Sequence, residues 1–477
     1  MTLRQVADIS VARLALPVPA GKLVVMHALA DALADPNIAG AFEDALVDWT
    51  RARQLESECL EALSVLLIAQ ARPELLNRVR GAIGRPSIAS DFLLSLAFGV
   101  PPIVSAWTGC QSGEAPHHVD VRSTLELLAG GTFIPPVFQH ALEHLEDMSG
   151  NPLSRQWAFE FDVLSGRVKN LADGHLSYFL GRERSNGGQF VAAQGHLARS
   201  AYLRTLVCAV EQWGMPQQLA VEYACKALPA DPLFLKLLPG RAPRWAQDLH
   251  HSFDDDSKPP ELVVRDCLRL IEAEGQRKVL HLSATVSDTA LRHVELTVFG
   301  MTSSAGVTDT ELGLGLHRWM LGKFTPMREG LRAFICPSWG AKGDLDFTPT
   351  VLPLIGFNVG YLQSDYVGCL PYVPFSTSSM PRIELVPAVG RVPLISQDVQ
   401  IGEFNSWYWN WQPSHPIGWS SPIACCSTLS AEAANTLEFD LGGRIHYVWE
   451  LTTWIRETDY GGWARAEQSG SFPAEAN

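Results

Sequence analysis

The apolar residues of this 477-residue chain change their spacing near residue 275, and no other property of the sequence limits the fold so strongly. Before this point, apolar residues recur every three or four positions, which is the spacing of amphipathic helices. After it, apolar and polar residues alternate, and β-branched and aromatic residues become frequent, as in strands. Helical and strand segments that are separated along the chain predict an α+β protein.

Residues 20–100 are predicted to form a stack of helices. The segments "RPELLNRVRGAIG" and "RPSIASDFLLSLAFG" both begin with Arg-Pro and end with Gly, which is how helices commonly begin and end. Helices of about 11–17 residues joined by short turns pack as antiparallel neighbours. A helical bundle and a HEAT-like array, in which helix pairs recur roughly every 30–40 residues, both fit this pattern.

A segment rich in Pro, Gly and Ser, residues 101–121, interrupts the helical pattern, which then resumes. We therefore predict three domains. The first is a helical bundle or helical-repeat domain over 1–100, the second is another helical domain over 122–275, and the third is a β-rich mixed domain over 276–477.

Two strand pairs are predicted in the C-terminal part. Residues 278–286 and 291–300 both alternate apolar and polar side chains, which indicates a β-hairpin. Residues 436–457 indicate a second pair, in which Gly442-Gly443 supplies the turn between two alternating runs.

Charge and motifs exclude several function classes. The chain has 51 acidic and 37 basic residues, a formal net charge of −14. Residues 343–477 contain 14 acidic residues, five Arg and no Lys, a local net charge of −9. Because Lys and Arg supply the phosphate contacts of DNA-binding proteins, we do not expect this part to bind duplex nucleic acid. The sequence has no G-x-x-x-x-G-K-[ST] or G-x-S-x-G motif, and no G-x-G-x-x-G opens a helix after a strand. We therefore do not expect a P-loop ATPase, a serine hydrolase of the G-x-S-x-G type or a Rossmann dinucleotide-binding domain.

Cysteine usage and the N-terminus indicate the compartment. None of the nine Cys forms C-x-x-C, and several lie in apolar helical runs, so we expect free thiols in a reducing cytosol. "MTLRQVADIS" lacks the basic start and apolar core of a secretory signal. The apolar run "ALSVLLIAQA" is shorter than the roughly 20 residues that span a bilayer. We therefore expect a cytoplasmic protein that has no membrane partner.

The segment "HALEHLEDM", residues 140–148, is the first candidate for chemistry. His140 and His144 lie one helical turn apart, and Glu143 lies between them. Two such imidazoles suit a zinc ion, and a neighbouring carboxylate can take a proton from zinc-bound water. The alternative is the solvated face of an amphipathic helix, and we favour this interpretation.

The order H-x-x-E-H resembles the motif of the inverzincins, the pitrilysin-type metallopeptidases. This resemblance implies that a glutamate further along the chain completes the site. Glu211 and Glu222 lie in helical segments at a suitable distance, and Glu222 is the predicted third ligand. The cofactor would be zinc; in the favoured interpretation there is no cofactor.

Two further segments are rich in possible ligands. "DLHHSFDDDSK", residues 248–258, contains two His and four Asp, which suits either a cation site or a solvated acidic loop. We favour the loop. "APHHVD", residues 115–120, contains two adjacent His with no visible partner.

Tryptophans gather in "NSWYWNWQPSHPIGW", residues 405–419. In a strand, Trp407, Trp409 and Trp411 share one face, and Trp419 follows nearby. Such a row fills the core of a β domain or forms a surface that binds a ligand or a protein partner. Core filling is the favoured interpretation.

Two functional hypotheses follow. The preferred one is a non-catalytic interaction or adaptor subunit of a larger cytoplasmic assembly, which binds protein partners through helical surfaces and a Trp-rich β domain. The alternative is a zinc-dependent hydrolase or peptidase with Glu143 as the base. The sequence does not fix the oligomeric state.

Overall fold

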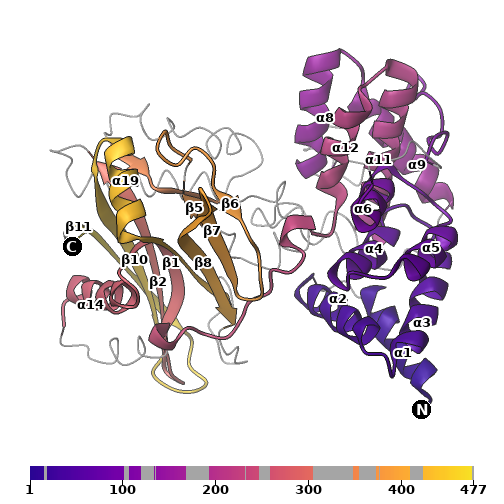
Figure 1. The fold of residues 1–477 in the computed structure, drawn as a ribbon. Helices are drawn as coiled ribbons and strands as arrows, with labels where there is room; N and C mark the ends of the chain where they lie inside the picture. Colours follow the sequence, from indigo (N-terminus) through magenta and orange to yellow (C-terminus); the bar gives the residue numbers. More distant parts are fainter. Residues whose placement is uncertain are drawn as a thin grey trace. The chain divides into compact units, whose positions relative to one another are not determined.

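The computed structural model describes the chain in segments that together form two compact units. The described residues are 1–15, 19–100, 107–119, 134, 136–167, 193–230, 232–246, 258–303, 347–353, 372–374, 376–408 and 423–474. Those up to Leu235 form the helical unit, and those from Lys236 on form the sheet unit (Figure 1). The helical part, residues 3–273, precedes an antiparallel sheet, which confirms the predicted α+β class. The division into three domains stays a prediction.

The predicted stack over residues 20–100 is confirmed. It consists of α2 (Pro19–Ala34), α3 (Ala39–Arg51), α4 (Cys59–Ile68), α5 (Pro73–Ala82) and α6 (Ile88–Phe98), preceded by α1 (Leu3–Ala12) and the short 3₁₀ helix η1 (Arg13–Ala15). Helices α1, α3 and α5 pack in succession, as do α2, α4 and α6. The helices of the stack therefore form two series of packed neighbours.

The helix ends follow the expected chemistry. Pro73 is the first residue of α5, where the missing N–H costs no hydrogen bond. Helix α6 begins at a capping box, in which the Ser87 hydroxyl accepts a hydrogen bond from the Ser90 amide at 3.1 Å. It ends at Gly99, which has a left-handed backbone with φ of 64°.

The helical unit continues after residue 134. Its later elements are α8 (Pro136–Ser149), α9 (Leu153–Arg167), α11 (Ala193–Trp213), α12 (Gln217–Ala224), η2 (Cys225–Ala227) and η3 (Pro232–Phe234). Helix α9 packs against both α8 and α11, and α11 packs against α12. Buried apolar side chains from Ala7 to Leu235 form one cluster, so these helices share a single core with the stack. Within the described part of the chain, no helix is both long and apolar enough to cross a membrane.

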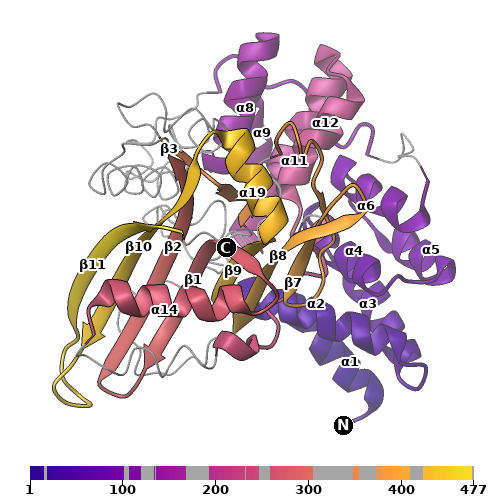
Figure 2. The ribbon, with the colours of Figure 1, turned by 60° about the vertical axis from the view of Figure 1, so that its left-hand side comes forward.

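The sheet unit is built on one large antiparallel sheet (Figure 2). Its strands are β1 (Arg277–Asp288), β2 (Arg292–Ser303), β6 (Glu384–Leu385), β7 (Arg391–Ser396), β8 (Val399–Tyr408), β9 (Ile423–Ser430), β10 (Arg444–Ile455) and β11 (Ala464–Pro473). The described strands lie in the order β11-β10-β2-β1-β9-β8-β7-β6. Strand β3 (Phe347–Pro349) also pairs with β2, and β4 (Val351–Pro353) pairs with β5 (Tyr372–Pro374).

The first predicted hairpin is confirmed, because β1 and β2 pair in antiparallel register. Two helices, α14 (Pro260–Ala273) and α19 (Ala431–Leu441), lie across one face of the sheet (Figure 2). The Tyr447 hydroxyl on β10 donates a hydrogen bond to the Glu272 carboxylate on α14. On the opposite face, the ring of Tyr372 stacks on His281 with centroids 3.8 Å apart. Both faces of the central strands are therefore covered.

The second predicted hairpin is wrong in its first half. Residues 436–441 belong to helix α19 and form no strand. Ser430 caps this helix, and Gly442 ends it in the left-handed conformation, with φ of 71°. A Gly-Gly pair therefore ends a helix here, and the predicted strand after it is β10.

Candidate functional site

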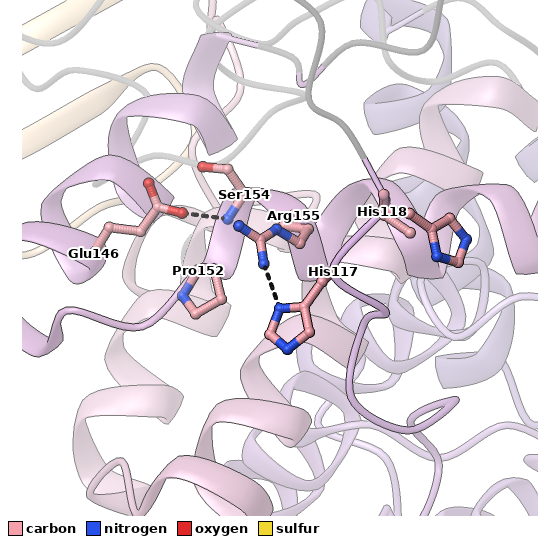
Figure 3. A pocket seen from close by; sticks show the side chains of 7 residues that line it. His117, His118, Glu146, Pro152, Ser154 and Arg155 are labelled. Atoms are coloured by element: carbon pink, nitrogen blue, oxygen red, sulfur yellow. Dashed lines mark hydrogen bonds between the residues drawn. The ribbon is translucent and has the colours of Figure 1, made fainter.

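A polar hollow of about 370 Å³ lies on the helical unit (Figure 3). Its walls come from the loop that follows Trp107, from the end of α8 and from the beginning of α9. The lining side chains are His117, His118, Val119, Glu146, Pro152, Ser154 and Arg155. A volume of this size falls at the small end of ligand sites, which span roughly 300–1,000 Å³.

Hydrogen bonds from α9 and α11 hold the loop over residues 107–119 in place. The Gln156 amide donates to the Gly113 carbonyl at 2.7 Å and accepts from the Ala115 N–H at 2.7 Å. The Glu160 carboxylate accepts from the Ser112 N–H and hydroxyl at 2.6 and 2.7 Å. These buried helix side chains fix the backbone of residues 112–115, and therefore also the position of the segment that carries His117 and His118.

The turn between α8 and α9 positions the other wall. The Glu146 carboxylate accepts a hydrogen bond from the Ser154 N–H at 2.6 Å, so an internal anion occupies the N-terminus of α9. This contact fixes Ser154 and Arg155 at the first turn of α9. The Arg155 guanidinium donates to Nδ1 of His117 at 3.5 Å (Figure 3). Since the guanidinium can only donate, Nδ1 is the acceptor in this contact, which assigns the ring proton of His117 to Nε2.

A network of buried charges fills the interior of the same unit. Lys22 Nζ on α2 lies 2.5 Å from Glu61 Oε1 on α4, and both side chains are almost completely buried. His196 Nε2 on α11 lies 3.3 Å from the same Glu61 oxygen. The Ser57 hydroxyl meets His196 Nδ1 at 2.9 Å.

Ser57, His196 and Glu61 contain the residue types of a catalytic triad, but their arrangement differs from one. In a hydrolytic triad, Nε2 faces the nucleophile and Nδ1 faces the carboxylate. Here the two nitrogens are exchanged, and the Ser57 hydroxyl is completely buried and also bonds the His196 carbonyl. A substrate cannot reach this hydroxyl, so the network ties α4 to α2 and α11.

Burial and neighbouring charges set the ionisation of this network. Burial alone would raise the pKa of Glu61, but the charges and hydrogen bonds of Lys22 and His196 lower it to about 2. Burial and the Arg199 charge lower the pKa of His196. A second group continues the network, in which Arg204 donates to Glu56 at 2.5 and 2.7 Å.

Arg204 connects this interior to the loop that carries the hollow. Its other terminal nitrogen lies 3.7 Å from the Glu160 carboxylate, which in turn holds Ser112. Burial raises the pKa of Glu160, and the Ser112 hydrogen bonds oppose this shift. The loop is therefore anchored on a buried charge cluster and not on apolar packing alone.

The four predicted zinc residues lie on two helices, α8 and α12. The side chain of His140 on α8 lies outside the described residues. Glu143 is exposed and accepts a hydrogen bond from Gln139. His144 is exposed and stacks on Tyr223 of α12, with ring centroids 6.4 Å apart. Glu222 is an exposed residue of α12.

Glu211, the other proposed third ligand, has different partners. Its carboxylate accepts hydrogen bonds from the Gly109 N–H at 2.7 Å and from Gln111 at 3.2 Å. Among the residues that the structure describes, no group of three His, Cys, Asp or Glu could hold a metal ion. In the segment 248–258, only Lys258 is described. The assignment of His140, Glu143, His144 and Glu222 stays a prediction.

Of the four candidate tryptophans, Trp407 on β8 is described. Its side chain is 1% exposed and packs edge-on against Trp245, with centroids 5.2 Å apart. Trp409, Trp411 and Trp419 lie outside the described residues. A binding surface formed by this group stays a prediction, and Trp407 itself fills a core.

The outer edge of β11 is a second candidate site. All ten residues of β11 pair with β10 without a shift in register. In the described part of the chain, no strand pairs with its other side. Residues 464–469 are exposed, and Arg465 and Glu467 form an ion pair on one face. The opposite edge strand, β6, has two residues.

Sequence reasoning missed the hollow because its residues come from three separated elements. The His117-His118 pair was visible, but nothing in the sequence connected it to Glu146 or Arg155. The Asn151-Pro152 pair marks a turn between two helices, and this turn is the local signal that could have placed Arg155 at a helix start.

Comparisons of the chain with protein-family models, with curated proteins and with solved structures find no match.

Proposed function

We propose that the protein is a non-catalytic interaction subunit, which assembles through the outer edge of β11. The observation that carries this proposal is a ten-residue edge strand whose side chains are exposed from Ala464 to Ser469. An unpaired edge presents backbone N–H and C=O groups that another extended strand can bind. Proteins usually shorten or interrupt such edges, and β11 has neither a bulge nor a proline before its last residue.

The charge pattern of β11 favours a second copy of the chain as the occupant. In an antiparallel pair centred on Ala466, Arg465 lies opposite Glu467 of the other copy, and Glu467 lies opposite its Arg465. Opposite charges in directly facing positions stabilise a pair of strands by roughly 0.2–1 kcal/mol each. A two-fold axis uses the same residues on both copies, which is the commonest symmetry of homodimers.

Charge exchange at these two positions tests the proposal on the full chain. Sedimentation analysis should show a wild-type dimer. Arg465→Glu and Glu467→Arg should each weaken self-association by about tenfold or more, because like charges then face each other twice. Circular dichroism of each variant checks that the sheet is retained.

Mixing the two variants gives the sharper result. Each negative strand of Arg465→Glu then faces a positive strand of Glu467→Arg, so a heterodimer should form. The double variant R465E/E467R should also dimerise, since it is self-complementary again. A monomeric wild-type protein, or single variants that associate as tightly as the wild type, would contradict the proposal.

A further inference from the structure

We infer that the hollow at His117 and Arg155 binds a phosphate group, either free phosphate or a small phosphate monoester. This inference is independent of the β11 interface. It rests on the side chains that face the hollow, since Glu146 already occupies the N-terminus of α9. The hollow is open to solvent on the helical unit, where its two imidazoles are exposed.

Arg155 brings a positive charge to the wall of the hollow. Other arginines of the helical unit, among them Arg51, Arg72, Arg78 and Arg204, form ion pairs with carboxylates. No ion pair of Arg155 is found among the described residues; its guanidinium meets the His117 imidazole instead. A guanidinium fork that is partly desolvated and not matched by a carboxylate suits the two oxygens of a phosphate.

The His117 imidazole offers a hydrogen-bond donor beside Arg155. With Nδ1 of His117 accepting from Arg155, its Nε2–H is left to donate to a ligand. His118 and Ser154 also line the hollow. Figure 3 shows the Arg155 guanidinium beside the His117 imidazole, whereas the His118 ring points away from them. Phosphate sites combine arginine with neutral donors in this way.

One wall of the hollow also carries a negative charge. Glu146 is the carboxylate among the lining residues, and one of its oxygens accepts from the Ser154 N–H at 2.6 Å. This hydrogen bond draws its charge toward α9. Its remaining charge opposes an anion, so we expect a moderate affinity, with a dissociation constant in the micromolar to millimolar range.

Calorimetric titration of the full chain with inorganic phosphate at constant ionic strength tests the inference. Phenyl phosphate is the monoester probe, and chloride is the reference anion. Saturable binding of phosphate at one site is the expected result. A tighter constant for phenyl phosphate than for inorganic phosphate would identify a monoester as the ligand, and the reverse order would identify free phosphate.

Variants decide whether the hollow is the site. Arg155→Gln should weaken binding about tenfold or more, because it removes the fork. Arg155→Lys should restore part of the affinity, since it keeps the charge and loses the fork. His117→Gln should have a smaller effect.

Arg167→Gln is the matched control, because Arg167 is an exposed arginine in the last turn of the same helix. Binding by this variant should equal that of the wild type. Absence of saturable binding above the chloride reference would overturn the inference. So would an equal loss in Arg155→Gln and Arg167→Gln, because general electrostatic attraction would then explain the titration.

Discussion

The two units of this protein bury different kinds of side chain. The largest completely buried side chains of the helical unit include Lys22, Arg199 and Arg204. Those of the sheet unit are all aromatic: Trp407, Tyr372, Tyr447, Phe299 and Phe404. Charges that are buried in a core need a partner of opposite sign in a fixed place, whereas aromatic rings need only a matching shape. The helical unit therefore needs paired charges in addition to the apolar packing of its core. The largest buried side chains of the sheet unit depend on volume.

Removal of Arg204 should strongly destabilise the helical unit. Arg204→Met keeps an unbranched chain but removes the guanidinium that pairs with the buried Glu56 and Glu160 carboxylates. We expect the free energy of unfolding to fall by about 3–5 kcal/mol, measured by urea denaturation. This loss would come from the two carboxylates that stay buried without their counter-charge, since the substitution removes little volume.

Arg51→Met is the control for Arg204→Met. The Arg51–Asp48 pair has side chains that are 63% and 54% exposed, so its loss should cost less than about 1 kcal/mol. If the two variants lost equal free energy of unfolding, burial of the ion pair would be irrelevant. The helical unit would then not depend on its buried charge pairs in the way proposed.

The sheet unit should respond to loss of volume instead. Trp407→Ala removes a buried indole that packs on Trp245 and should lower the free energy of unfolding by about 3–5 kcal/mol. Trp407→Phe should recover part of this loss, because a ring again fills the space. Val399→Ala, at an exposed position of the same strand, should stay within about 0.5 kcal/mol. A Trp407→Phe variant as unstable as Trp407→Ala would contradict a volume effect.

Acid should weaken the helical unit through Glu61. Its pKa is lowered from 4.5 to about 2 in the folded state, so the fold favours the carboxylate form. The corresponding stability is present above pH 4.5 and is lost as pH falls from 4.5 through 2, a change of a few kcal/mol. Urea denaturation between pH 5 and pH 3 should show this slope.

Glu61→Gln supplies the reference for the acid experiment. The variant is expected to be less stable at pH 7, because Lys22 loses its buried counter-charge. Its stability should then depend less on pH between 5 and 3 than that of the wild type. An unchanged slope would mean that other carboxylates cause the acid sensitivity.

Local sequence signals predicted most of the elements. Helices α5 and α6 were visible because Pro and Gly stand at their ends, and the β1–β2 hairpin was visible because its apolar residues alternate. Residues 436–441 were wrongly predicted to form a strand, because Leu437, Phe439 and Leu441 alternate with other residues as in a strand. In helix α19, Leu437 faces the core while Phe439 is 83% exposed. The N-cap Ser430 and the three alanines among the next four residues were the stronger signal.

Pairs that are distant along the chain could not be predicted. Lys22 and Glu61 are 39 residues apart, and Arg204 and Glu56 are 148 residues apart. Each of these residues alone resembles a solvated helix position, because charged side chains are rarely buried without a partner. The hollow could not be predicted for the same reason, because Arg155 becomes a candidate ligand only when the loop at His117 lies beside it.

The smallest predicted effect concerns the fit between one glycine and one ring in the sheet unit. A Cβ atom at Gly470 would lie 2.7 Å from Cζ2 of Trp449, whose side chain is almost completely buried. The indole must therefore move in Gly470→Ala, at an expected cost of about 1–3 kcal/mol in urea denaturation. Gly462→Ala meets no atom within 4 Å and should be neutral or slightly stabilising. If Gly470→Ala were as stable as Gly462→Ala, this part of the sheet would tolerate added volume, and shape would not be the property that holds its core together.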